Sequence, residues 1–146
     1  MSDPVSDGKT PSIIDFNAEL AKLTRFRGRT PQSTMADRKG SAAQLASYRD
    51  GALIVSSFAG TGHWEAHPGD ELIHILDGTA TAEIVCDDGP PRSFALHAGI
   101  MAVIPQGTWH RFLSSEGATM MAATPFPGEH IELDVDDPRM VERKPA

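Results

Sequence analysis

Turn-forming residues interrupt the chain at short intervals from Ser41 onward, and this spacing limits the possible fold more than any other feature. Gly, Pro and Asp recur together about every 8 to 12 residues, as in Asp50-Gly51 and Asp77-Gly78. The runs between these turns have alternating or β-branched character, as in ALIVSSFAG and ELIHILD. The pattern predicts an all-β sandwich or barrel, with about six to ten antiparallel strands between Ser41 and Pro125.

The first forty residues have a different character. Apolar side chains recur there at spacings of three and four, at Ile13, Phe16, Leu20 and Leu23. This stripe predicts a short amphipathic helix over residues 13–23, packed on the barrel or on a second subunit. Residues 24–40 are rich in Arg, Gly, Pro and Ser, and we expect them to form a loop that lies across the main body as a strap.

A length of 146 residues favours one domain. We expect residues 1–40 to be an N-terminal extension with the short helix, and residues 41–127 to form the barrel. The charged residues 128–146 should form a loosely ordered tail.

Composition excludes several classes of partner. Thirteen basic and twenty acidic residues give a net charge of −7, and no basic cluster alternates with aromatic residues, so nucleic acid is not expected. No apolar run approaches the roughly 18 residues that span a membrane. The first residues are acidic and turn-forming rather than signal-like, and the lone Cys86 cannot form an internal disulfide, so we expect a cytoplasmic protein.

Histidines and glutamates gather in the stretch GTGHWEAHPGDELIHILDG. In an extended strand, alternate side chains share a face, so His63, Glu65 and His67 should point to one side and Trp64 to the other. The chain should bend at residues 68–70 and enter the next strand. There Glu71, Ile73 and Ile75 should share one face, and His74 should lie on the opposite face.

A second stretch, IPQGTWHRFLS, makes a turn at residues 105–107 and enters another strand. Thr108, His110, Phe112 and Ser114 should share one face of it. His110 is therefore the natural partner of the first cluster. The predicted pocket is lined by His63, Ile73, Ile75, Phe112 and Ser114.

Both stretches resemble the motifs of small single-domain cupins of the cupin 2 conserved barrel family. The later part of the first motif matches at His67, Glu71 and Gly78. The second motif matches, with Ser114 in place of the usual Asn, at Gly99, Pro105, Gly107 and His110. The resemblance implies an antiparallel double-stranded β-helix, or jelly-roll barrel, that holds a metal. Carried over position by position, it implies the ligands Glu65, His67, Glu71 and His110, with Glu65 where the family has a histidine.

Two imidazoles and a carboxylate can hold Fe, Mn, Zn or Ni and leave coordination positions open. His67, Glu71 and His110 supply that set, and Glu65 is either a fourth ligand or a catalytic base. Without a metal, the two glutamates should repel each other, and at least one should hold its proton more tightly. That proton could serve acid–base chemistry instead.

Two functions remain open. The first is a metal-dependent enzyme acting on a small molecule, with a dioxygenase as the leading hypothesis. The second is a non-catalytic cupin that binds or senses a small metabolite, and a sugar isomerase or epimerase is a weaker third hypothesis. The acidic pocket disfavours anionic sugar phosphates unless a metal offsets its charge. The resemblance also implies a homodimer, for which Trp64 and Trp109 would supply outward-facing apolar surface.

Overall fold

The computed structural model describes residues 10–141, which form one short α-helix, nine strands and a short 3-10 helix. The helix α1 (Phe16–Ala21) precedes the strands, and η1 (Pro138–Met140) follows them. The strands are β1 (Phe26–Arg29), β2 (Ala42–Tyr48), β3 (Gly51–Thr61), β4 (Trp64–Ala66), β5 (Glu71–Ile84), β6 (Arg92–His97), β7 (Met101–Ile104), β8 (His110–Pro125) and β9 (Glu129–Ile131).

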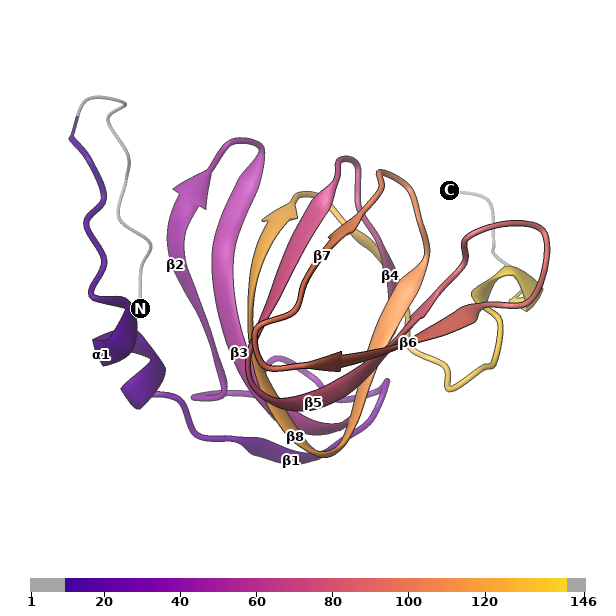
Figure 1. The fold of residues 1–146 in the computed structure, drawn as a ribbon, viewed down its shortest axis with the longest axis horizontal. Helices are drawn as coiled ribbons and strands as arrows, with labels where there is room; N and C mark the ends of the chain where they lie inside the picture. The colour runs from indigo at the N-terminus through magenta and orange to yellow at the C-terminus, as the bar shows by residue number, and fades with distance from the viewer. Residues whose placement is uncertain (1–9, 142–146) are drawn as a thin grey trace.

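The strands form one sheet that curls into a barrel, with α1 outside it on one side and the C-terminal segment on the other (Figure 1). The long strand β8 is central, because it pairs with β3, β4 and β5. β5 also pairs with β6 and β7, β2 pairs with β3, and β9 pairs with β4. These pairs are antiparallel, whereas β1 runs parallel to β3. The predicted all-β barrel is confirmed, and this parallel pair is the exception to its antiparallel pattern.

The barrel interior is apolar. β5 shows why, since Ile73 and Ile75 are buried on one face while His74 is half-buried on the other. The buried apolar cluster consists of Phe58, Ile73, Ile75, Ala82, Leu96, Ile104 and Met120. Gly78 lets β5 approach β8 closely, because a Cβ there would lie 2.1 Å from the Gly117 carbonyl oxygen. Among the described residues, no helix is long and apolar enough to cross a membrane.

The N-terminal extension differs from the sequence prediction in two ways: its helix is shorter, and its predicted loop contains a strand. α1 begins after Asp15, whose side chain caps it by accepting a hydrogen bond from the Ala18 amide at 3.0 Å. The predicted helix over residues 13–23 is therefore too long, and Ile13 is 90% exposed outside it. The predicted strap contains β1, which lies along β3 and places Arg29 opposite Gly60.

The segment after the barrel also differs from the expected loose tail. Its first part forms β9, which pairs with β4. The next part covers Trp64, whose indole N–H donates to the Val135 carbonyl at 2.9 Å. The guanidinium of Arg111 lies 4.8 Å from the Trp64 ring and forms ion pairs with Glu83 and Asp134. Trp64 lies on the face opposite Glu65, as predicted, but it is fully buried beneath this segment and so does not supply the exposed apolar surface expected for a dimer contact.

A candidate metal centre

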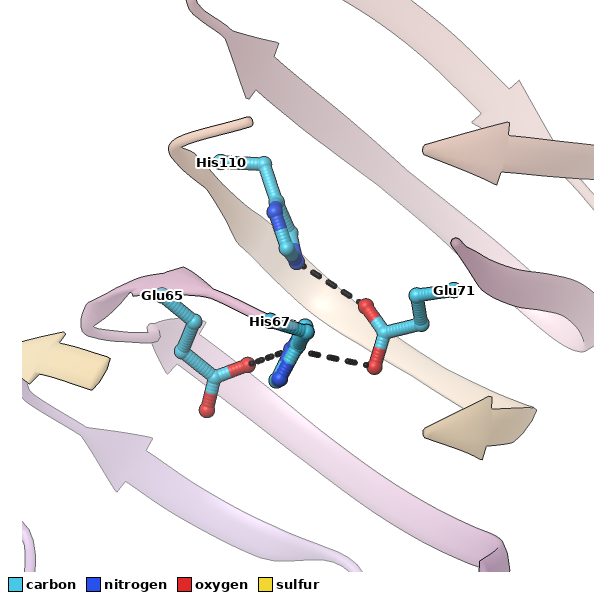
Figure 2. Close-up of side chains that lie close together, drawn as sticks. All are labelled: Glu65, His67, Glu71 and His110. Atoms are coloured by element: carbon cyan, nitrogen blue, oxygen red, sulfur yellow. Dashed lines mark hydrogen bonds and ion pairs between the residues drawn. The ribbon is translucent and has the colours of Figure 1, made fainter. Parts of the chain in front are cut away.

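Four side chains from three strands converge inside the barrel (Figure 2). Glu65 lies in β4 and His67 directly follows it, while Glu71 and His110 are the first residues of β5 and β8. Each offers one ligand atom, and these atoms all lie within 4.8 Å of one another. The structure thus brings together the four residues that the sequence singles out as metal ligands.

Two turns hold these residues in register. The carboxylate of Asp70 accepts a hydrogen bond from the Gln106 amide at 2.8 Å. The Gly107 amide donates to the His67 carbonyl at 2.9 Å. The bend before β5 and the turn before β8 are thus joined directly, and Asp70 is a structural turn residue.

The orientation of His110 is set by its own backbone neighbour. Its Nδ1 lies 2.9 Å from the Thr108 carbonyl oxygen, which can only accept, so Nδ1 carries a proton. Its Nε2 then faces Glu71 Oε1 at 2.9 Å. The other Glu71 oxygen accepts a hydrogen bond from the Thr124 hydroxyl at 2.7 Å. A lone pair on Nε2 would meet a carboxylate oxygen, so a proton or a metal ion must lie between them.

His67 is buried without a hydrogen bond. Its Nε2 lies 3.3 Å from Glu71 Oε2 and 3.5 Å from Glu65 Oε2, which are ion-pair separations. Within residues 10–141, neither ring nitrogen has a hydrogen-bond partner. Gly128 leaves room for the ring, because a Cβ there would lie 2.9 Å from His67 Nδ1.

Neighbouring charges shift the pKa values of three side chains in the cluster: His67, Glu71 and Glu65. Burial would lower the pKa of His67, but the carboxylates of Glu65 and Glu71 outweigh it and raise the pKa to about 10. Burial would raise the pKa of Glu71, but His110 and His67 lower it below its ordinary value. Glu65 is shifted downward in the same way, with burial opposed by the hydrogen bond from His63 at 2.7 Å and by His67. The prediction that one glutamate holds its proton more tightly is wrong, because the imidazoles offset the repulsion.

These residues fit a divalent ion. Ligands held about 2.1 Å from a metal are separated from their neighbours by about 3.0–3.4 Å in octahedral or tetrahedral geometry. The donor separations of 2.9, 3.3 and 3.5 Å in this cluster fall close to that range. One ion bound at His67 Nε2 would explain both why that nitrogen has no hydrogen bond and why His110 Nε2 lies so close to Glu71 Oε1.

The predicted pocket residues lie around the cluster in different ways. Ile73 and Ile75 are buried, and the Phe112 ring contacts His110 edge-on with ring centroids 5.7 Å apart. His63 binds Glu65 and is not one of the four converging residues. Ser114 serves the backbone, because its hydroxyl donates to the Thr79 carbonyl and accepts from the Gly117 amide.

Sequence reasoning missed three residues near the site. Thr124, which holds Glu71, lies at the far end of β8, where nothing in the local pattern indicates a polar role. Arg29 and Arg38 come from the predicted strap, and the charge of Glu65 acts on both. The abundance of arginine in that strap was the one available signal. A pocket of about 390 Å³ borders His67 on the side of Trp109 and Gly128.

Comparisons with known proteins agree with this architecture. Residues 57–124, which include all four converging residues, match the family model described as the cupin domain. A search of curated proteins found no match. A solved cupin-2 domain containing protein from Shewanella frigidimarina has 23% identity and a TM-score of 0.56, covering 79% of this chain and 96% of that one.

Two further structures share the fold. A conserved protein of unknown function from Streptococcus pyogenes has 19% identity and a TM-score of 0.55, covering 87% of this chain and 96% of that one. A hydroquinone 1,2-dioxygenase, solved with Cd²⁺ and 4-hydroxybenzonitrile, has 18% identity and a TM-score of 0.51. That match covers 57% of this chain and 63% of the dioxygenase chain, which is less than two thirds of its length. Identities this low show the fold alone.

Proposed function

Because the chain carries a cupin domain, we propose that it binds one divalent metal ion and acts on a small organic molecule as a metal-dependent dioxygenase. The observation that carries this proposal is the buried His67 ring, whose nitrogens have no hydrogen-bond partner among the described residues, within a cluster of two carboxylates and a second imidazole. The mixed nitrogen and oxygen donors suit Fe, Mn, Zn or Ni.

Each residue of the cluster has a distinct part in this proposal. His67, Glu71 and His110 hold the ion, and Glu65 is the fourth ligand or the base. When bound, such an ion supplies Lewis acidity and, for iron or manganese, one-electron chemistry. Thr108 and Thr124 orient His110 and Glu71 through the hydrogen bonds described above. On the interior side the site is apolar, because Ile73 of the buried cluster follows Glu71 on the same face of β5.

The dioxygenase assignment is supported by fold similarity to hydroquinone 1,2-dioxygenase, which is an analogy. Its test is elemental analysis of protein purified without an affinity tag, followed by oxygen-uptake measurements with a panel of small phenols in air and under argon. We expect about one metal ion per chain and substrate loss in air alone. Ligand binding without turnover would favour the metabolite-binding alternative, and protein without metal affinity would contradict the proposal as a whole.

Replacing Glu65 by histidine separates its two candidate roles. Histidine is the usual ligand at this position in the cupins that the sequence resembles, so the Glu65→His protein should bind metal at least as tightly as the wild type. If Glu65 is the base, turnover should fall by about 10² to 10⁴ despite full metal loading. Metal titration and turnover of Glu65→His and Glu65→Gln, measured together, decide between the roles. Unchanged turnover in both variants would exclude the base.

We also propose a homodimer, supported by apolar surface on the outer face of the sheet rather than by the buried Trp64. Met101 and Val103 on β7 are 58% and 64% exposed and lie beside His74 and Leu72 of β5. A charge there should oppose association, so Val103→Glu should sediment as a monomer where the wild type sediments as a dimer. Leu133→Glu is the control, since Leu133 is similarly exposed at 51% outside β7. A monomeric wild type at micromolar concentration would contradict the proposal.

A further inference from the structure

The arginines of this chain differ in how their charges are neutralised. Arg25, Arg111 and Arg139 each form an ion pair with a carboxylate at 2.8–2.9 Å. Arg29 and Arg38 are half-buried, yet within residues 10–141 their guanidinium groups form neither a hydrogen bond nor an ion pair. The fold therefore leaves two partly desolvated cations without a counterion in contact.

Arg29 is directed toward the barrel interior. It ends β1, and its guanidinium lies 4.9 Å from the centroid of the Phe58 ring, which belongs to the buried apolar cluster. Its Nε is fully buried and has no partner among the described residues. The same group lies beside Gly62, where a Cβ would be 3.6 Å from Arg29 Cζ. The guanidinium thus sits between the core and the connection that leads into β4.

Arg38 lies in the turn-rich segment that follows β1, and its charge acts on Arg29. The pKa of Arg29 is lowered to about 10, mainly by burial and also by the charge of Arg38. The charge of Glu65 opposes this shift. Burial also lowers the pKa of Arg38, again against the effect of Glu65. The charge of Glu65 thus acts on two cations, and Glu65 is already engaged by His63 and His67.

An anion would relieve this arrangement. A desolvated guanidinium is unfavourable without a counter-charge, and two neighbouring guanidiniums repel each other. The planar fork of an arginine matches the two oxygens of a carboxylate or phosphate. Phe112, which is partly buried beside His110, offers apolar surface to the remainder of such a molecule.

We propose that Arg29, with Arg38 as a second cation, binds the oxyanion of a small organic acid beside Gly62, in the connection that leads to Glu65 of the candidate metal centre. The inference deepens the proposed function, on which it rests, by naming the substrate class as anionic. It also revises the expectation that an acidic pocket disfavours anions, because Arg29 and Arg38 of the predicted strap bring positive charge to it. The shared chemistry is a carboxylate or a phosphate on an apolar body.

The test compares matched probes by calorimetry on metal-loaded and metal-stripped protein. Benzoate and phenyl phosphate carry the two oxyanions, and benzamide is the neutral counterpart of benzoate. We expect saturable binding of at least one anion and at least tenfold weaker binding of benzamide. Arg29→Gln and Arg38→Gln should each weaken anion binding about 10- to 100-fold. Arg27→Gln is the control, because Arg27 lies exposed on the same strand.

The outcomes separate this inference from the metal proposal. Metal content is measured for every variant, and the Arg29 and Arg38 variants should retain the metal content of the wild type. If the protein has no metal affinity but binds the anion in a way that depends on Arg29, the anion site is supported and the metal site is contradicted. No saturable anion binding, equal binding of benzamide, or an equal loss in Arg27→Gln would overturn the inference.

Discussion

Replacing His110 by alanine should leave the purified protein without stoichiometric metal. The change removes the most buried donor of the cluster and also leaves Glu71 Oε1 without its partner at 2.9 Å. His67→Ala should have the same result, because it removes the donor that lies between both carboxylates. Loss of one of three or four ligands usually abolishes binding of a divalent ion at micromolar concentration. Elemental analysis after dialysis measures the effect.

His74→Ala is the matched control for both variants. His74 lies three residues after Glu71 but on the opposite face of β5, so its removal should leave the metal content unchanged. Far-ultraviolet circular dichroism of each variant distinguishes loss of the site from loss of the fold. A folded His110→Ala protein that keeps a full equivalent of metal would exclude His110 as a ligand.

Replacing Trp64 by alanine should produce the largest loss of stability. The Trp64 side chain on β4 is fully buried against Arg111 and the C-terminal segment. Truncation of a buried Trp costs about 3–5 kcal/mol. The indole hydrogen bond to Val135 is lost as well. Trp64→Phe keeps most of the packing and should cost less, mainly the roughly 1 kcal/mol of a hydrogen bond together with some lost volume. Urea unfolding followed by circular dichroism gives both values.

Trp109→Ala provides the comparison within the same chain. Trp109 is half-buried, so the same truncation there should cost less than at Trp64. Equal losses at the two positions would mean that the C-terminal segment does not cover Trp64 in solution. A Trp64→Ala protein as stable as the wild type would contradict the packing described for this side of the barrel.

The all-β fold could be predicted because its determinants are local. Turn residues mark where strands end, and strict alternation fixes which side chains share a face. Glu71, Ile73 and Ile75 on one face of β5 follow directly from this alternation. The same alternation on the second stretch pointed to His110 as the partner of the first cluster, and the resemblance to a known motif supported that link.

What could not be predicted depends on contacts between distant segments. Trp64 alternates correctly with Glu65, but its burial depends on Val135, and no local signal shows that the last segment folds back. Thr124 and Glu71 meet only because β8 is long enough to bring its far end alongside β5. Arg29 reaches the barrel through the parallel pairing of β1 with β3, which an arginine-rich loop gives no reason to expect.

The central place of β8 has a consequence for the order in which the protein matures during synthesis. β3 and β5 are made first, yet the strand that joins them is β8, which pairs Gly51 with Pro125 and Leu72 with Ala123. Domains fold as their chain emerges from the ribosome, and pairings between remote segments must wait for both partners. A nascent chain that has exposed Glu65, His67 and Glu71 still lacks the strand that presents His110. The candidate metal centre is therefore complete only after β8 has been made.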